Sequence, residues 1–416
     1  MKGSADRILT THAGSLPRPD DLLEMLYARS EGTPLDRSSS EKLRNVVADI
    51  VGEQAHAGID IVSDGEFGKA GFVGYVNGRL AGFEPDPDRQ RGNPWAGSRE
   101  QLSFPEYYRQ GTNTSTGALP RFRFRSRSLK CTSPITYTGH KQLQEDIENL
   151  KVALNRVAVA EAFMPSTSPA NVQSWNVNCY YPTDEEYALA IAEAMREEYQ
   201  AIVDAGLIVQ IDDPQLLTEY LRKPQLSMAQ WRKWAEKQIE ILNNALRGIP
   251  QDKVRFHTCY GIDVGPRVHD LELKDIVDLL LKVNAGAYSI EGANARHEHE
   301  WKVWKDVKLP DDKILIPGVI TQSSVLVEHP ELVADRIRRY AGVVGRERVI
   351  AGTDCGFGTI AGLPTVHVSI VWRKLQSLVE GAQIASRELW HRNSVAGRKS
   401  ALCPSGRNGR TGWSGR

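Results

Sequence analysis

The amino-acid sequence predicts an α/β protein, a (β/α)8 TIM barrel with an insertion after the second strand. Eight short apolar runs, rich in β-branched residues, alternate with longer amphipathic stretches. This alternation is typical of a parallel sheet covered by helices. Eight such units close a barrel, whose functional residues stand at the carboxyl ends of the strands.

The eight predicted strands are spread along the whole chain. They are Ile8–His12, Ile59–Ser63, Val159–Met164, Leu207–Ile211, Val254–Cys259, Tyr288–Glu291, Ile314–Val319 and Arg348–Thr353. The clearest helices between them are Glu41–Ala57, Glu185–Ala205, Met228–Leu246, Lys274–Val283 and Glu331–Val344. In Glu185–Ala205 the apolar residues repeat at helical spacing, and Pro182-Thr183 supplies a cap before it.

One region interrupts the alternation of strands and helices. Residues 82–130 are rich in Pro, Gly, Arg and aromatic residues and contain no strand–helix unit. We expect residues 82–140 to form an insertion that includes an extended piece, Arg121–Tyr137, in a hairpin, followed by a helix over Lys141–Val157. Long irregular connections in compact domains often act as lids, so this insertion is predicted to cover the barrel mouth.

The barrel is expected to occupy residues 1–390 as a single domain. Residues 391–416 hold six Lys or Arg residues, no acidic residue and many Gly and Ser residues, without apolar periodicity. This composition predicts a disordered basic tail, and a short RNA-binding arm is the alternative.

Composition excludes several broad classes of function. Lys plus Arg and Asp plus Glu are equal at 52 each, which argues against a charge field for nucleic acid or a membrane. Apolar runs long enough to span a bilayer and a secretory signal are both missing, so a cytoplasmic location is expected. The five cysteines are few and odd in number, which favours free thiols or metal ligands over a disulfide framework.

The residues His257-Thr258-Cys259 are the centre of the predicted site. Residues i and i+2 of a strand face the same side, so the imidazole and the thiol share one volume at the end of a predicted strand. Glu291 ends the next strand and Cys355 follows the last one, at intervals of 32 and 64 residues along the chain. We therefore expect all four side chains to converge at the barrel mouth.

Two thiolates, an imidazole and a carboxylate suit Zn²⁺ in tetrahedral geometry. Alternatives are a buried Cys beside a core His, or a nucleophilic Cys–His pair, which here lacks an obvious third group to orient it. Zinc deprotonates a thiol that is otherwise mostly protonated at neutral pH, its pKa being about 8.5. Glu291, the most labile of the four ligands, is the one expected to be displaced by a substrate thiol.

Further polar residues follow the other predicted strands. Ser15 follows the first strand, Glu66 the second and Asp212 the fourth. Each side chain could simply cap a turn between strand and helix. Several acids around one mouth are better explained by a cationic group on the substrate, such as the ammonium of an amino acid.

Together these residues resemble the catalytic half of cobalamin-independent methionine synthases and their shorter single-barrel relatives. The motifs that carry the resemblance are THAGSLPRP (11–19), IVSDGEFGK (61–69), VQIDDP (209–214), FHTCYG (256–261), YSIEGA (288–293), IPGVI (316–320) and AGTDCGFGT (351–359). They occur in the family's order across residues 7–390.

The resemblance implies a function and roles for individual residues. His257, Cys259, Glu291 and Cys355 match the zinc ligands of the family. Ser15, Glu66 and Asp212 match the residues that hold the amino acid part of homocysteine. The implied reaction is methyl transfer from 5-methyltetrahydropteroyl(tri)glutamate to homocysteine, which yields methionine.

Three departures from the family pattern leave the methyl donor open. The synthases carry an additional N-terminal barrel, which these 416 residues do not include. Ser323 stands where the family places a catalytic His after the seventh strand, so no general acid is assigned. Residues 165–169 do not clearly reproduce the folate-side sequence of the synthases.

The alternatives keep the barrel and change the reaction. The short relatives include epoxyalkane:coenzyme M transferases, so a zinc-dependent transferase that adds another thiol to an epoxide or other electrophile is one alternative. A non-catalytic barrel that binds zinc or a small ligand is the other. The thiol, the alkyl donor and the oligomeric state stay open.

Overall fold

The computed structural model describes residues 1–89, 95–109, 128–261, 265–363 and 366–399, with the backbone alone over 391–399. Eight strands form one parallel sheet in the order β1-β11-β10-β9-β8-β7-β5-β2. The strands are β1 (Leu9–Thr10), β2 (Ile61–Val62), β5 (Glu161–Thr167), β7 (Ile208–Asp212), β8 (Val254–His257), β9 (Ala287–Ile290), β10 (Ile314–Ile320) and β11 (Ile350–Thr353). Each lies where the sequence predicts a strand.

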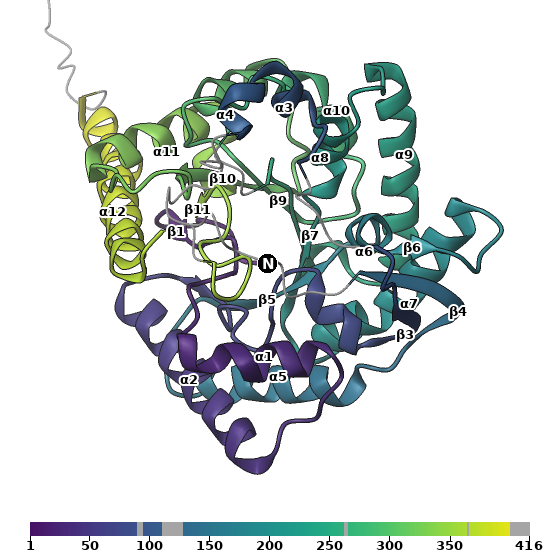
Figure 1. Ribbon diagram of the computed structural model, residues 1–416. Helices are drawn as coiled ribbons and strands as arrows, with labels where there is room; N and C mark the ends of the chain where they lie inside the picture. Colours follow the sequence, from purple (N-terminus) through teal and green to yellow (C-terminus); the bar gives the residue numbers. More distant parts are fainter. Residues whose placement is uncertain (90–94, 110–127, 262–264, 364–365, 400–416) are drawn as a thin grey trace, which may run out of the picture.

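The two edges of this sheet meet between β1 and β2. The Asp60 backbone N–H donates to the Thr10 carbonyl over 3.2 Å, and the Thr11 hydroxyl donates to the Ile61 carbonyl over 3.0 Å. The Asp60 carboxylate also accepts a hydrogen bond from the Thr10 backbone N–H. The sheet therefore closes into a barrel, and Figure 1 shows helices around its outside. The predicted (β/α)8 class is confirmed.

The helices that cover the barrel follow the predicted segments closely. The long ones are α2 (Arg37–His56), α5 (His140–Leu154), α7 (Asp184–Asp204), α9 (Met228–Ala245), α11 (Pro330–Val344) and α12 (Val368–Lys399). A capping box begins α7: the Thr183 hydroxyl accepts from the Glu186 backbone N–H, and the Glu186 carboxylate accepts from that of Thr183. Shorter helices are α1 (Leu23–Ser30), α6 (Pro169–Trp175) and α8 (Gln215–Arg222).

One helix prediction is wrong in length. Instead of a helix over Lys274–Val283, the chain forms a 3-10 turn, η4 (Leu273–Asp275), and a single α-turn, α10 (Val277–Leu280). Ile276 separates them with a φ of −131°, outside the helical range. The Leu273 backbone N–H is bound to the Glu300 side chain over 2.7 Å, which fixes how the segment begins.

The core has two layers. Inside the barrel, one apolar layer combines residues from seven strands: Leu9, Ile61, Phe163, Ile208, Ala287, Ile316 and Ile350. Outside, the other faces of the strands pack against the helices, as Phe256 of β8 does. On β8 the residues next to Phe256, Arg255 and His257, are buried and polar, and the Arg255 guanidinium lies over the Phe163 ring at 4.3 Å. The interior is thus apolar in one layer and polar toward the carboxyl ends of the strands.

The insertion builds a second, three-stranded sheet. β3 (Leu80–Pro85) pairs with β4 (Leu129–Tyr137) in an antiparallel hairpin, and β4 pairs with β6 (Val177–Asn178). Two short helices, α3 (Arg99–Ser103) and α4 (Pro105–Arg109), lie between the hairpin strands in sequence. Residues 121–127 of the predicted extended piece lie outside the described residues.

The described part of the insertion lies against loops at the barrel mouth. The Arg99 side chain donates to the Tyr220 carbonyl over 2.8 Å, and the Glu100 carboxylate accepts from the His269 backbone N–H over 2.9 Å. Tyr220 belongs to the segment after β7 and His269 to the segment after β8, at the carboxyl ends of both strands. A role for the insertion as a lid stays a prediction.

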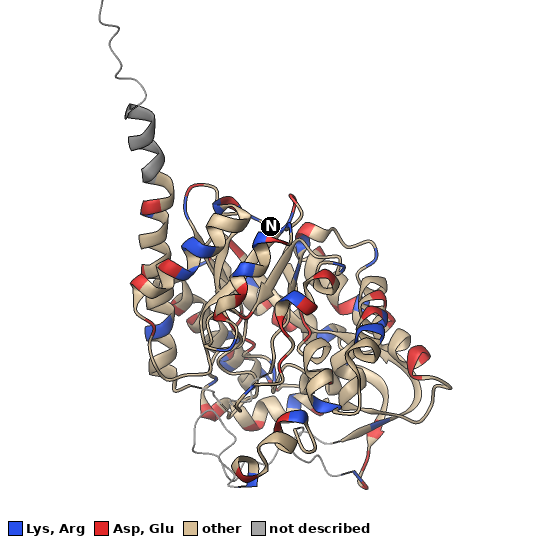
Figure 2. Ribbon diagram, turned by 90° about the horizontal axis from the view of Figure 1, so that it is seen from above, with Lys and Arg blue, Asp and Glu red and all other residues tan. Residues whose placement is uncertain are grey.

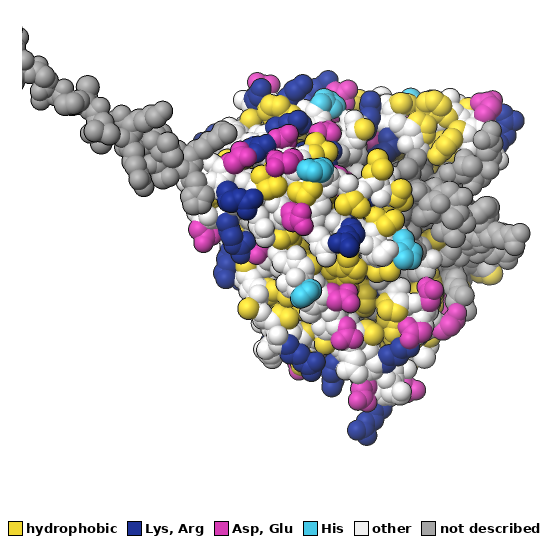
Figure 3. Space-filling view, turned by 90° about the vertical axis from the view of Figure 1, so that its left-hand side faces the viewer, with side chains coloured by type: hydrophobic (Ala, Val, Ile, Leu, Met, Phe, Trp, Pro, Cys, Tyr) yellow, Lys and Arg dark blue, Asp and Glu magenta, His cyan; other side chains and the backbone are white. Residues whose placement is uncertain are grey.

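The C-terminal part of the chain continues further as a helix than the sequence predicts. The backbone of α12 runs to Lys399 and so includes the first nine residues, 391–399, of the expected tail, and residues 400–416 lie outside the described residues. Figure 2 shows acidic and basic residues interspersed along the ribbon. On the side formed by α11 and α12, apolar side chains are spread among charged ones (Figure 3). Among the described helices none combines the length and hydropathy that crossing a membrane requires.

A buried ionic network joins the insertion to the barrel. The Glu198 carboxylate of α7 accepts hydrogen bonds from Tyr75, from Tyr137 of β4 and from Arg79, at 2.6, 2.7 and 3.0 Å. Arg79 also pairs with Asp146 of α5. Burial opposes ionisation of Glu198, but Arg79 and the other donors outweigh it and lower the pKa of Glu198 to about 2. Glu198 therefore depends on Arg79, whereas Asp146 pairs with Arg29 as well.

Replacing Arg79 with Met is expected to lower the free energy of unfolding by about 3–5 kcal/mol, because it removes the cation paired with the buried Glu198 and one of the two cations paired with Asp146. Urea denaturation monitored by circular dichroism measures this loss. The matched control is Arg247→Met, which breaks an exposed pair with Glu193 and should change stability by less than about 0.5 kcal/mol. A loss below about 1 kcal/mol for Arg79→Met would contradict the assigned role.

Candidate metal centre

Three of the predicted ligands come together at the end of the barrel. One ligand atom each of His257, Cys259 and Cys355 lies within 4.8 Å of the others, and all three residues are buried. His257 ends β8 and Cys259 follows it, whereas Cys355 follows β11. The two sulfur atoms are 3.3 Å apart. Strands distant in the sequence thus supply one compact donor group.

The His257 ring is oriented for metal binding. Its Nδ1 atom is 3.0 Å from the Ser289 hydroxyl on the neighbouring strand β9, whereas Nε2 is buried and has no hydrogen-bond partner among the described residues. Burial, with help from the positive charge of Arg255, lowers the pKa of His257 to about 3. The imidazole is therefore neutral, the form that ligates a metal, and its second nitrogen is oriented by a neighbouring side chain, as in many metal sites.

The thiols of Cys259 and Cys355 are buried away from water. The adjacent Cys259 thiol, burial and the negative charge of Glu291 together raise the pKa of Cys355 well above its usual value. Two neighbouring thiols in such a place are poor candidates for free nucleophiles, because the thiolate is the reactive form. A cation held between them would reverse this preference, since metal coordination deprotonates thiols.

Glu291, the fourth predicted ligand, lies outside the group of three. Its Oε1 atom accepts from the Tyr260 backbone N–H over 2.8 Å, and its Oε2 atom accepts from Arg267 over 3.0 Å and from the Asn294 side chain over 2.7 Å. Burial raises the pKa of Glu291 to about 7, although Arg267 acts in the opposite direction. The carboxylate is thus next to the donor group and turned toward Arg267.

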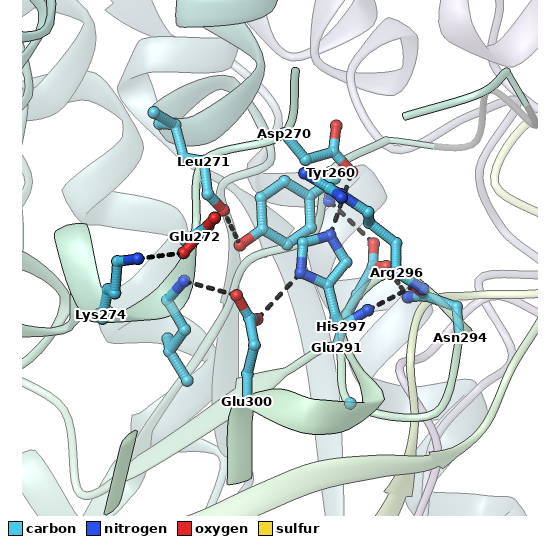
Figure 4. A network of polar contacts seen from close by, with 12 residues as sticks. Tyr260, Asp270, Leu271, Glu272, Lys274, Glu291, Asn294, Arg296, His297 and Glu300 are labelled. Carbon is cyan, nitrogen blue, oxygen red and sulfur yellow. Dashed lines mark hydrogen bonds and ion pairs between the residues drawn. The ribbon is translucent and has the colours of Figure 1, made fainter. Parts of the chain in front are cut away.

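A wider polar network around His297 lies beside the donor group (Figure 4). His297 is hydrogen-bonded to Asp270 over 3.0 Å and to Glu300 over 2.9 Å, and its ring stacks on Tyr260 with centroids 4.0 Å apart. Asp270 also pairs with Arg267 over 2.7 Å. Burial disfavours the imidazolium, but the bonds to Asp270 and Glu300 outweigh it and raise the pKa of His297 to about 9.

Ser15, Glu66 and Asp212 also reach this end of the barrel. Asp212 stands beside His257 in the register of β7 and β8. The Ser15 hydroxyl lies against Gly356, next to Cys355, where it leaves no room for a Cβ atom. Burial and the negative charge of Glu66 raise the pKa of Asp212 well above its usual value, so these two carboxyls interact. The geometry leaves two buried acids close to the metal-ligand group.

Ser323 follows β10 in a partly buried position. Its backbone N–H donates to the Thr321 hydroxyl over 3.1 Å, and its own Oγ atom is buried without a hydrogen-bond partner among the described residues. A serine hydroxyl does not titrate near neutral pH, so this position supplies no general acid of the usual kind.

Sequence reasoning missed Arg267, Asp270 and the role of His297. Arg267 and Asp270 lie in the loop after β8, where no strand periodicity indicates the direction of a side chain. The spacing of Arg267 and Asp270, three residues apart with opposite charges, was the available signal, but such pairs are common on protein surfaces. Only the structure shows both residues buried.

Comparisons with known proteins agree with the fold and the motifs. The family model described as the catalytic domain of cobalamin-independent synthases matches residues 8–91 and 166–383. The unmatched residues 92–165 include α3, α4, β4 and α5. The matched part therefore contains all the residues of the candidate site.

Individual relatives cover almost the whole chain. A methionine synthase of Thermococcus kodakarensis is 27% identical over 386 residues, which are 91% of this chain and 94% of the relative. One of Sulfurisphaera tokodaii is 26% identical over 384 residues, 91% and 93% of the two chains. A solved B12-independent methionine synthase from Shewanella sp. W3-18-1, in complex with selenomethionine, has a TM-score of 0.67 at 19% identity, covering 92% of this chain and 99% of that one. That structural likeness supports the fold.

The His297 network predicts a pH dependence of stability. In the unfolded chain the pKa of histidine is about 6.5, so the folded-state value of about 9 favours the folded protein. This contribution, about 3 kcal/mol, is fully present below about pH 6.5 and is lost as the pH rises through about 9. In urea denaturation, the difference in unfolding free energy between wild type and His297→Gln should therefore shrink by that amount from pH 6 to pH 9.5.

The exposed His140 provides the control, because His140→Gln should change stability little at either pH. A difference between wild type and His297→Gln that stays constant over this pH range would argue against a protonated His297.

Proposed function

The chain belongs to the cobalamin-independent methionine synthase family, whose catalytic-domain model matches most of its length, and on that premise we propose a zinc-dependent transfer of a methyl group to homocysteine, giving methionine. The observation that supports it most is the buried group of His257, Cys259 and Cys355 in the same barrel end as Glu66 and Asp212. A donor group for a thiophilic metal beside two acids suits a substrate with both a thiol and an ammonium group.

The residues of the donor group fit zinc. Two sulfur atoms and one imidazole nitrogen are ligands that zinc prefers, and the buried Nε2 atom of His257 lacks any other partner among the described residues. Glu291 lies beside the group as an exchangeable fourth ligand. When bound, zinc would deprotonate an incoming thiol and hold its sulfur as a nucleophile at neutral pH.

The amino acid part of the substrate has matching partners. Glu66 and Asp212 are buried carboxyls whose ionisation becomes favourable when an ammonium group lies between them. The Ser15 hydroxyl, against Gly356, is placed to contact the same end of the substrate. These contacts would fix the thiol relative to His257, Cys259 and Cys355, and orientation of this kind accounts for much of the rate enhancement in a transfer reaction.

The transfer forms a sulfur–carbon bond and breaks the bond between the methyl group and the donor. With 5-methyltetrahydropteroyl(tri)glutamate as the donor, the broken bond is a nitrogen–carbon bond. The thiol proton is released, and the donor nitrogen takes up a proton. Ser323 stands where the family carries a histidine, so that second proton comes from a group other than this side chain.

Ser323 also favours a second candidate function. Without the histidine, the residues present still suit activation of a thiol, and the electrophile can differ. A zinc-dependent transferase that opens an epoxide with a thiol such as coenzyme M would keep His257, Cys259 and Cys355 and would not need the folate donor. Substrate assays decide between the two.

Purified protein is expected to hold about one zinc ion per chain, measured by plasma emission spectrometry. Cys355→Ala removes one of three strong ligands and should lower zinc content severalfold under mild chelation. Cys179→Ala is the matched control, since Cys179 is an exposed free cysteine away from the group, and it should keep full zinc. Full metal content in Cys355→Ala would remove the basis of the proposed site.

Zinc-loaded protein is expected to form methionine from homocysteine and 5-methyltetrahydropteroyltriglutamate, detected by mass spectrometry. Asp212→Asn should raise the KM for homocysteine about tenfold or more while zinc content stays unchanged, because it removes a charge that faces the ammonium group. Turnover of an epoxide with coenzyme M, without methionine from any methyl donor, would instead establish the second candidate.

A further inference from the structure

The carboxylate of Glu291 is held away from the metal-ligand group by three donors. They are the Tyr260 backbone N–H, the Asn294 side chain and the Arg267 guanidinium, and only Arg267 carries a charge. Tyr260 directly follows Cys259 in the chain, so its hydrogen bond places the Glu291 carboxylate beside the donor group. In this arrangement the labile ligand is already paired with another partner.

Arg267 is itself held firmly in place. It is 8% exposed, and its Nε atom donates to Asp270 over 2.7 Å. Its backbone adopts a φ of 57°, a left-handed conformation that is unfavourable for a residue with a side chain. Such a conformation persists only where the surroundings impose it. Arg267 is therefore a preorganised cation and does not adapt to Glu291.

The Arg267 guanidinium pairs with two carboxylates, Asp270 and Glu291, which come from different segments of the chain. Asp270 pairs with both Arg267 and His297. Glu300 accepts from the other ring nitrogen of His297 (Figure 4). One Nη atom of Arg267 is buried without a partner among the described residues. The guanidinium has unused capacity toward an acceptor.

We propose that Arg267 is a positioning residue that binds the Glu291 carboxylate whenever this ligand leaves the metal, so that a substrate thiol can take its position. This inference rests on the proposed function. Glu291 moves between two partners, the metal and Arg267, while His257, Cys259 and Cys355 stay in place. The substrate thiol loses its proton to solvent and enters the ligand position as a thiolate. The Glu291 carboxylate leaves that position, so one anion replaces another.

The physical reason is the cost of an unpaired buried charge. A carboxylate released into a buried volume without a counter-ion costs several kcal/mol, which would oppose its departure from a cation. Arg267 compensates that charge with an ion pair already in place. The expected consequence is easier exchange of Glu291 for sulfur, and thus tighter thiol binding without any contact between Arg267 and the thiol.

Zinc-edge X-ray absorption tests the proposal directly. Wild type is titrated with homocysteine, and the replacement of an oxygen neighbour of zinc by sulfur is followed. In Arg267→Met, Glu291 loses its alternative partner, so the homocysteine concentration for half-replacement should rise about tenfold or more, with zinc content unchanged. A half-replacement concentration within about twofold of wild type would overturn the proposal.

Matched variants separate positioning from structural damage. Arg247→Met makes the same substitution in an exposed Arg–Glu pair and should leave the titration unchanged. If Arg267→Met does not fold, Arg267→Gln, which keeps donors without the charge, is read by the same criterion. In a Glu291→Gln background, Arg267→Met should have no effect on the titration, and a persisting tenfold shift there would also overturn the proposal.

The same titration distinguishes failure of the proposed function from failure of this inference. If wild-type zinc takes up no sulfur at any homocysteine concentration, the proposed thiol chemistry is wrong, and the inference that rests on it fails too. If the wild type takes up sulfur and Arg267→Met does so equally well, only the role of Arg267 is wrong.

Discussion

The register between β7, β8 and β9 determines the geometry of the whole site. Asp212, His257 and Ser289 stand opposite one another across three parallel strands, so backbone hydrogen bonds alone align an acid, a proposed metal ligand and the residue that orients its ring. A shift of one residue in β8 would turn the His257 side chain from the barrel interior to the helices. Closure of the barrel then brings Cys355, at the end of β11, to the other side of the same volume.

The buried charged residues around these strands form two groups in which carboxylates pair with an arginine. Glu198 and Asp146 share Arg79 beneath the insertion, and Glu291 and Asp270 share Arg267 beside the metal-ligand group. In both places one guanidinium joins two carboxylates from different segments of the chain. The first set fixes the insertion hairpin to α5 and α7. The second joins the loop after β8 to the end of β9, so the same type of interaction that maintains the fold also sets the state of a ligand.

The sequence predicts most of the fold because the alternation of apolar runs with amphipathic stretches, and the points where the runs end, can be read from neighbouring residues. All eight strands and the long helices other than α12 lie where the periodicity indicates, and His257 and Cys259 point together because strand geometry requires it. Glu291 shows where such reasoning stops: it directly follows β9, as the sequence indicates, but its carboxylate is turned toward Arg267, in a loop without periodicity. The short α10 likewise depends on a bond from Leu273 to the distant Glu300, which local propensity cannot indicate.

Two residues of the site have left-handed backbones without being glycine: Glu66, with a φ of 60°, and Arg267, with a φ of 57°. Each such conformation costs about 1 kcal/mol or more, and a glycine at either position would relieve it. That relief is smaller than the cost of breaking the buried ion pairs that both side chains make, Glu66 with Arg18 and Arg267 with Asp270 and Glu291. Under selection for heat tolerance these two positions would therefore keep their charged side chains, and the backbone strain would persist as a fixed cost of the ion pairs.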